Sequence, residues 1–205
     1  MKAPHAYARG MDPTGVSLQR NNFSMIERII CAGFGGQGIM AMGKVLALSA
    51  MREGKFVTWL PAYGAEVRGG TAHCMVIISD SPISSPYVDK ADTLIILNAP
   101  SLQKFKNSIR DNGLLLVNSS LADCKATSRR LNIVNCPMTA MASKLGLDKV
   151  ANTIAIGVYL GKKKIISTST MEKAIEEVLA HKDKLIAINK RALEEGFFFA
   201  QKGQK

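Results

Sequence analysis

The 205-residue sequence lacks several features that would mark particular classes of protein. No apolar run approaches the roughly 20 residues that a membrane-spanning helix needs, and residues 1–24 lack the apolar core of a secretory signal. Aromatic residues make up only 6% of the chain, which gives little support to a protein that binds single strands by base stacking. These absences indicate a globular protein, which we expect in the cytoplasm and without a membrane partner.

The cysteines are few and widely spaced. They stand at positions 31, 74, 124 and 136, so no C-x-x-C pair typical of a structural zinc site or an iron–sulfur cluster is present. His73 and Cys74 are neighbours on an expected strand, where their side chains point to opposite faces and do not share a metal. We therefore predict no metal site, and we expect reduced, buried cysteines of an intracellular protein.

Acidic residues are scarce relative to basic ones. Sixteen Asp and Glu residues stand against 27 Lys and Arg residues, which gives a formal net charge of +11. This excess favours an anionic partner, which is a nucleic acid, an acidic protein or a phosphorylated small molecule. A nucleic-acid-binding module ranks last because the charge is its only support, and no nucleic-acid partner is predicted.

The apolar pattern predicts strands alternating with helices. Short apolar runs predict strands, and these lie at residues 28–32, 56–60, 71–79, 93–97, 114–117 and 133–135. Helical spacing predicts helices, and these lie between Gly38 and Gly54, from near Pro100, at 139–145, at 150–160, and from Ser169 to near Gly196. Gly146 and Gly161 are interpreted as helix ends, and Asp111-Asn112-Gly113 as a turn. The alternation predicts a three-layer α/β/α fold, Rossmann-like, with a largely parallel or mixed sheet.

The same pattern sets the expected domain boundaries. Residues 1–24 show no periodicity and are interpreted as a flexible leader before a plausible natural start at Met25. Residues 25–200 form a single α/β domain, and residues 201–205 form a polar tail. Phe197, Phe198 and Phe199 are expected to be buried against the domain or a partner, because three exposed phenylalanines would promote aggregation.

A glycine-rich turn joins the first strand to the first helix. It reads Gly33-Phe34-Gly35-Gly36-Gln37-Gly38. Its glycines allow positive φ and a close approach to the backbone, and the free N–H groups at the following helix end attract anions. Four glycines exceed what strand–helix packing alone requires. The Gln37 amide both donates and accepts hydrogen bonds, so we predict that this turn contacts a cofactor or a neighbouring chain.

The turn also matches the G-x-G-x-x-G pattern of dinucleotide-binding proteins. That interpretation requires an acidic residue at the end of the second strand, where the chain instead reads Trp59-Leu60-Pro61-Ala62. No Gly-Lys-Ser/Thr follows the glycines, so a P-loop is also disfavoured. A stand-alone NAD(P)-binding enzyme is therefore the weaker alternative, which tight NADH binding would revive.

A second glycine-hinged loop follows the second strand. Its candidate substrate or interface residues are Tyr63, Gly64, Glu66, Arg68, Gly69 and Gly70. A solvated loop with a weak Glu66–Arg68 ion pair is one interpretation, and a docking loop in which the Arg68 fork binds an anion or partner is the other. If the first and second strands run in parallel, both loops lie at the same edge of the sheet.

The two loops together resemble a family. The stretches at 33–38 and 63–72, with Ser79-Asp-Ser-Pro-Ile, Asn98-Ala-Pro-Ser-Leu and Ala151-Asn-Thr-Ile-Ala, resemble the gamma subunit of 2-oxoacid:ferredoxin (or acceptor) oxidoreductases over about residues 25–200. One departure is Ala65, where the family has Pro, which leaves the loop less restricted in φ. The wording Arg-Gly-Gly-Thr-Ala is most similar to the 2-oxoglutarate type, and the pyruvate and branched-chain types stay open.

The resemblance implies an enzyme complex rather than an independent enzyme. Such complexes oxidatively decarboxylate a 2-oxo acid to an acyl-CoA and pass electrons to ferredoxin or another acceptor. Thiamine diphosphate, magnesium and iron–sulfur clusters are expected in the partner subunits, which are the alpha, beta and delta (ferredoxin-like) chains. This chain is expected to support assembly and the coenzyme A edge, with no catalytic residue and no cofactor held by it alone.

Overall fold

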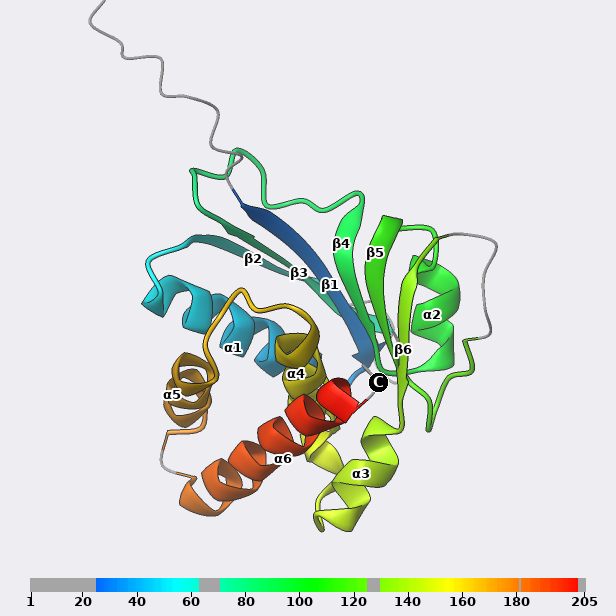
Figure 1. Ribbon diagram of the computed structural model, residues 1–205, viewed down its shortest axis with the longest axis vertical. Coiled ribbons are helices and arrows are strands. Elements are labelled where there is room, and N and C mark those ends of the chain that lie inside the picture. Colours follow the sequence, from blue (N-terminus) through cyan, green and yellow to red (C-terminus); the bar gives the residue numbers. More distant parts are fainter. Residues whose placement is uncertain (1–24, 63–70, 125–129, 181, 203–205) are drawn as a thin grey trace, which may run out of the picture.

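The structure is a computed structural model that describes residues 25–62, 71–124, 130–180 and 182–202. One six-stranded sheet lies between two unequal helical layers (Figure 1). The strands are β1 (Ile26–Phe34), β2 (Phe56–Ala62), β3 (Thr71–Ser79), β4 (Ala91–Ile96), β5 (Ile109–Asn118) and β6 (Asn132–Cys136). The helices are α1 (Ile39–Arg52), α2 (Ala99–Phe105), α3 (Met138–Lys144), α4 (Ala151–Lys162), α5 (Thr168–Val178) and α6 (Asp183–Lys202), with a 3₁₀ turn η1 at Asp148–Val150.

The sheet is mixed, with strand order β2-β3-β1-β4-β5-β6. Strands β1, β4, β5 and β6 are parallel, whereas β3 is antiparallel to both of its neighbours. Because β1 and β2 both oppose β3, they run in the same direction. Gly33 of β1 pairs with Ala72, and Ala62 of β2 pairs with His73, so the two strands end at the same edge of the sheet.

Two apolar cores form because the central strands bury both faces. In β1, Ile29 and Cys31 face α1 and α4, whereas Ile30 and Ala32 face α2 on the other side. Helices α1, α3, α4, α5 and α6 cover the first face, and α2 is the one helix of the described residues that covers part of the second (Figure 1). The expected three-layer α/β/α fold is therefore confirmed. Within the described ranges, no helix has both the length and the apolarity needed to cross a bilayer.

Two glycines interpreted as helix ends lie inside helices instead. Gly161 belongs to α4 and Gly196 to α6, and a Cβ on Gly196 would collide with the Ile154 carbonyl oxygen. Helices α4 and α6 therefore pack backbone against backbone, and Gln201 continues α6 beyond residue 200. Glycine costs about 1 kcal/mol of helix propensity, but here it provides the close approach.

The long helix expected from Ser169 to Gly196 is two helices. Helix α5 begins earlier, after Ser167, whose hydroxyl accepts a hydrogen bond from the Thr170 N–H, and α6 starts afresh at Asp183. The expected turn at residues 111–113 is also wrong. Strand β5 continues through these residues, where its pairing with β4 shifts register and Asn112 has a φ of 61°. Of the three C-terminal phenylalanines, Phe197 and Phe199 pack on the core and Phe198 remains 57% exposed.

Candidate functional site at the carboxyl edge of the sheet

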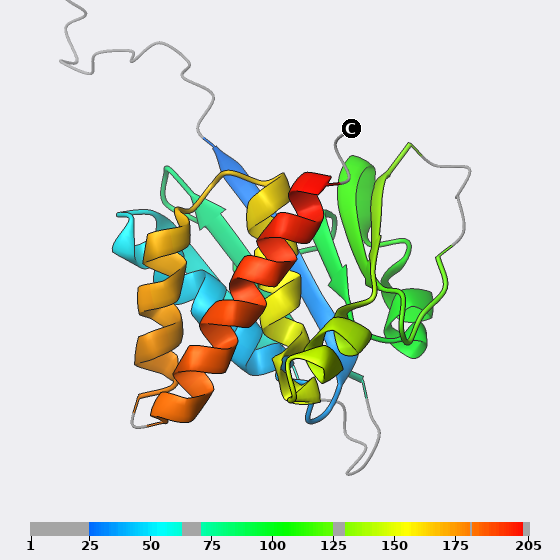
Figure 2. The ribbon, with the colours of Figure 1, turned by 60° about the horizontal axis from the view of Figure 1, so that its bottom comes forward.

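The adjacent ends of β1 and β4 define the candidate site. The chain leaves β1 toward α1 on one face of the sheet and leaves β4 toward α2 on the other face (Figure 2). Such divergence at neighbouring parallel strands opens a crevice at their carboxyl ends, which is where ligands bind in open α/β sheets. The glycine-rich turn after β1 lies at this crevice.

The turn reverses the chain through two left-handed glycines. Gly36 has φ 90° and Gly38 has φ 74°, values that residues with a Cβ adopt at a cost. The Gln37 N–H donates to the Phe34 carbonyl at 3.2 Å, and the Met42 N–H donates to the Gly38 carbonyl at 2.9 Å to begin α1. The sequence thus forms a tight strand–turn–helix connection.

The Gln37 side chain folds back over this turn. Its Oε1 accepts a hydrogen bond from the Phe34 N–H at 2.7 Å and a second from Asn98 Nδ2 at 3.2 Å. A Cβ on Gly33 would lie 2.6 Å from the same oxygen and 2.8 Å from Ile39 Cδ1, so a larger residue there would displace the Gln37 and Ile39 side chains. The Gln37 oxygen, predicted to meet another molecule, is therefore engaged within the chain.

Three asparagines complete a neutral amide cluster around the turn. Asn98 caps α2 by accepting from the Ser101 N–H at 2.9 Å. Asn118, at the end of β5, donates to the Leu97 carbonyl at 3.2 Å and to Thr139 Oγ1 at 2.9 Å. Asn152 donates to the Gly38 carbonyl at 3.1 Å. These amides fix β1, β4, β5 and α4 relative to one another.

An open cavity of about 210 Å³ adjoins the turn, with Gly36, Gln37, Thr139 and Lys149 among its lining residues. Gly35 and Gly36 are exposed, and a Cβ on either would meet no atom within 4 Å in the part of the chain that is described. The arrangement thus presents backbone amides without side chains beside a cavity that is lined by one basic residue, Lys149, and one acidic residue, Asp148.

The predicted site residues fall into two groups. Gly33 and Phe34 are the last residues of β1, and Gly35, Gly36, Gln37 and Gly38 form the turn that follows. Tyr63, Gly64, Glu66, Arg68, Gly69 and Gly70 lie outside the described residues, although the flanking Ala62 and Thr71 lie at this same edge. Sequence reasoning missed Asn118 and Thr139. A polar residue directly after an apolar strand is the signal that would have indicated Asn118.

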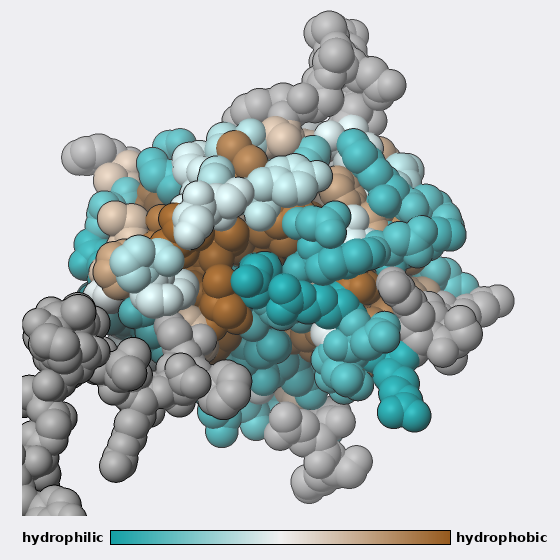
Figure 3. All heavy atoms as spheres, turned by 90° about the horizontal axis from the view of Figure 1, so that it is seen from above, coloured by the Kyte–Doolittle hydropathy of each residue, from teal (hydrophilic) through white to brown (hydrophobic). Residues whose placement is uncertain are grey.

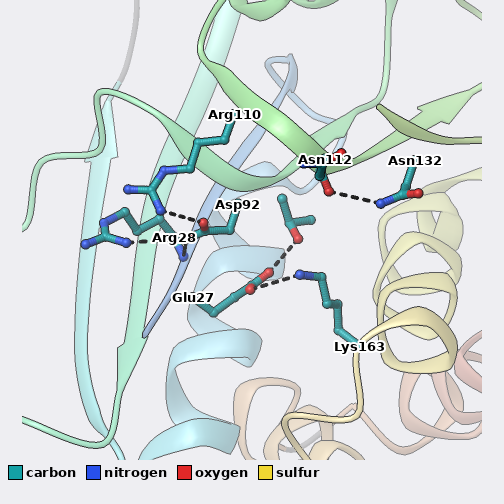
Figure 4. Close-up of polar contacts among 8 residues, drawn as sticks. Glu27, Arg28, Asp92, Arg110, Asn112, Asn132 and Lys163 are labelled. Carbon is teal, nitrogen blue, oxygen red and sulfur yellow. Dashed lines mark hydrogen bonds and ion pairs between the residues drawn. The ribbon is translucent and has the colours of Figure 1, made fainter. Parts of the chain in front are cut away.

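Buried charge lies at the opposite, amino edge of the sheet. Glu27, only 4% exposed, accepts a hydrogen bond from Thr93 Oγ1 and one from Lys163 Nζ at 3.1 Å (Figure 4). Burial raises the pKa of Glu27, and the contacts with Thr93 and Lys163 oppose that rise. Asp92 accepts from the Arg28 N–H at 2.9 Å and from Arg110 at 2.8 Å. When the molecule is viewed from the amino edge, apolar side chains gather in the middle and hydrophilic side chains lie beside them (Figure 3).

Comparison with known proteins identifies relatives over most of the chain. The family model described as pyruvate ferredoxin/flavodoxin oxidoreductase matches residues 28–199. The ketoisovalerate oxidoreductase subunit VorA of Methanothermobacter thermautotrophicus is 39% identical over 175 residues, which are 85% of this chain but only 36% of that protein. The 2-oxoglutarate synthase subunit KorC of Methanocaldococcus jannaschii is 34% identical over 161 residues, which are 77% of this chain and 86% of that protein.

Solved structures share the fold. The gamma subunit of a keto/oxoacid ferredoxin oxidoreductase from Geobacter sulfurreducens has a TM-score of 0.74 at 27% identity and covers 86% of this chain and 99% of its own. A 2-oxoglutarate:ferredoxin oxidoreductase from Magnetococcus marinus has a TM-score of 0.77 at 21% identity, covering 87% of this chain and 31% of its own, which shows the fold alone. The chain therefore belongs to the pyruvate ferredoxin/flavodoxin oxidoreductase family, which confirms the resemblance noted in its sequence.

Proposed function

We propose that the chain is the gamma subunit of a 2-oxoacid:ferredoxin oxidoreductase, and that its glycine-rich turn serves the active-site edge of the complex. The family match over residues 28–199 supports the first part. The observation that carries the second is the exposed backbone of Gly35 and Gly36 beside an open cavity. The turn carries no ionisable side chain, so its role is contact and positioning rather than proton transfer.

Two molecules fit such a surface, namely coenzyme A and a neighbouring subunit. Coenzyme A supplies the thiol that accepts the acyl group, and its phosphates are anions. The backbone N–H groups of Gly35 and Gly36, the start of α1 and the Lys149 ammonium are the groups of this chain suited to phosphates. Thiamine diphosphate, magnesium and the iron–sulfur clusters belong, on this proposal, to the alpha, beta and delta partners.

For the substrate we propose a class of compound, the 2-oxo acids. The KorC relative, matched over 86% of its own length, supports the 2-oxoglutarate prediction. The identity to VorA, 39%, is higher than the identity to KorC. A branched-chain 2-oxo acid is therefore the second candidate. Turnover of the purified complex with 2-oxoglutarate, ketoisovalerate and pyruvate in turn distinguishes them, because the correct substrate gives the highest kcat/KM.

A Gly35→Leu variant tests the proposed contact. Because the described surroundings of Gly35 leave space for a side chain, we expect the variant chain to keep its unfolding free energy within about 0.5 kcal/mol. In the complex, the added side chain would obstruct whatever approaches the turn, so acyl-CoA formation or subunit assembly is expected to fall at least tenfold.

The matched control is Ser84→Leu, an exposed change at the other end of the sheet, which should leave both readouts unchanged. A rise in the KM for coenzyme A with intact assembly would assign the turn to the cofactor, and loss of co-purification would assign it to a partner. Full assembly and unchanged kinetics in Gly35→Leu would refute the contact.

A further inference from the structure

Cys31 and Cys74 face each other across the centre of the sheet. They are direct partners in the antiparallel pairing of β1 with β3, and both are 0% exposed beneath α1. Directly opposed residues in antiparallel strands have Cα atoms about 4.5–5.5 Å apart. Disulfides span Cα separations of about 4.4–6.8 Å, so the register places both cysteines within bonding range without a rearrangement of the strands.

The Cys74 thiol donates a hydrogen bond to the Ile39 carbonyl at 3.4 Å, and its surroundings lower its pKa despite its burial. The Cys31 thiol, the Trp59 indole and the Gly43 backbone N–H each lower the pKa of Cys74 by hydrogen bonding, and together they outweigh the effect of burial. In contrast, the hydrogen bond with Cys74 and burial both raise the pKa of Cys31. Of the two sulfurs, Cys74 is therefore the better nucleophile, because the lower pKa gives it the larger thiolate fraction.

The packing places one partly exposed side chain beside this buried sulfur pair. A Cβ on Gly43 would collide with Cys74 Sγ and would lie 2.7 Å from Trp59 Nε1, so the Gly43 position admits no side chain. Trp59, on the neighbouring strand β2, is 37% exposed, and both its indole nitrogen and Cys74 Sγ lie against the Gly43 position. A small uncharged oxidant therefore needs a local displacement of Trp59 or α1 to reach Cys74.

We propose that Cys31 and Cys74 form a redox-active thiol pair that a small peroxide converts reversibly into a disulfide. The Cys74 thiolate attacks one peroxide oxygen, the O–O bond breaks, and hydroxide leaves and takes up a proton as water. The Cys31 sulfur then attacks the Cys74 sulfenic acid, forms the S–S bond and releases the second water. Two thiols and one hydrogen peroxide thereby become one disulfide and two waters.

Another buried cysteine provides the internal control. Cys136 is also 0% exposed, but its sulfur faces Met141 Sδ at 3.6 Å, and burial raises its pKa to about 12. On the proposal, Cys74 oxidises much faster than Cys136 although both are buried. Access through local unfolding alone would instead oxidise the two at similar rates.

The test uses the reduced full chain exposed to hydrogen peroxide. After quenching, free thiols are alkylated in denaturant and the protein is digested with trypsin. We expect a linked pair of the peptides 29–44 and 69–90, lighter by two hydrogens than their sum and separated again by dithiothreitol. Trp59 is the only tryptophan of the chain, so its fluorescence should fall and recover with the same kinetics.

Three variants keep the test decisive. Cys31→Ser should leave a Cys74 sulfenic acid that dimedone traps, Cys74→Ser should abolish the linked peptides, and Cys136→Ser should behave as the parent does. Full alkylation of Cys31 and Cys74 after peroxide treatment, or their oxidation no faster than Cys136, would overturn the proposal.

Discussion

The carboxyl and amino edges of the sheet hold their polar side chains with different chemistry. At the carboxyl edge, Gln37, Asn98, Asn118 and Asn152 hold the glycine-rich turn with neutral amides. At the amino edge, Glu27 and Asp92 are ionisable and sit against basic partners. Buried charge needs a counter-charge to be tolerated, whereas buried amides need only hydrogen bonds.

This difference distinguishes polar groups that stabilise the fold from polar groups that are exposed to another molecule. The charges of the amino edge are matched by partners on the same chain, so they position strands and α4 relative to one another. The amides of the carboxyl edge also find partners within the chain, on one another or on backbone carbonyls, but they leave the backbone of Gly35 and Gly36 exposed. At the carboxyl edge, the exposed groups of the turn are thus backbone groups, and they occur where the connections after β1 and β4 diverge.

The largest expected effect comes from Lys163→Met at the amino edge. The change removes the counter-charge of the Glu27 carboxylate, which is 4% exposed. We therefore expect the free energy of unfolding at pH 8 to fall by about 3 kcal/mol. The pKa of Glu27 is already raised above 4.5 in the folded state, so its protonated form favours folding. Stability from this group is present below pH 4.5 and is lost as the pH rises through the folded pKa.

Urea unfolding between pH 5 and pH 8 measures the predicted trend. The deficit of Lys163→Met should shrink toward pH 5, and adding Glu27→Gln should remove most of it. Lys162→Met is the matched control on the neighbouring lysine. If Lys163→Met lost the same unfolding free energy at every pH, Lys163 would act through packing. The claim that paired charge stabilises the amino edge would then be wrong.

An intermediate effect is expected from Asn118→Ala at the carboxyl edge. The variant loses the hydrogen bonds to the Leu97 carbonyl and Thr139 Oγ1 and leaves buried groups unsatisfied, which should cost about 2 kcal/mol. Because an amide carries no charge, this loss should be the same at pH 5 and pH 8. Asn135→Ala, an exposed asparagine with one bond to the Cys124 carbonyl, should stay close to the parent. A pH-dependent loss in Asn118→Ala would remove the contrast between the edges.

The smallest effect distinguishes two adjacent glycines of the turn. Gly36→Ala places a Cβ at φ 90°, which should cost about 1 kcal/mol although nothing described lies nearby. Gly35→Ala, with no left-handed backbone, should change the unfolding free energy by less than about 0.5 kcal/mol. Thermal unfolding of both variants checks the order, and equal losses would mean that backbone conformation does not explain the Gly36 position.

Several elements were predictable from local pattern. Thr71–Ser79 matches β3 at both ends because it contains a dense apolar run, Cys74 to Ile78, and breakers flank it. The turn and the start of α1 were predictable because glycines and an amphipathic run meet there. The predicted helix ends at Gly161 and Gly196 were wrong, because a glycine that terminates a helix and one that admits a neighbouring helix look alike in a single sequence.

The amino-acid sequence by itself determined the layered α/β fold, the glycine-rich turn and the family, because these depend on periodicity and on short motifs. Only the tertiary structure decided that Gln37 turns inward to Asn98, that Glu27 meets Lys163 across 136 positions, and that Cys31 opposes Cys74. Such contacts depend on strand order and register. Packing of the whole chain sets both, and no local segment specifies them.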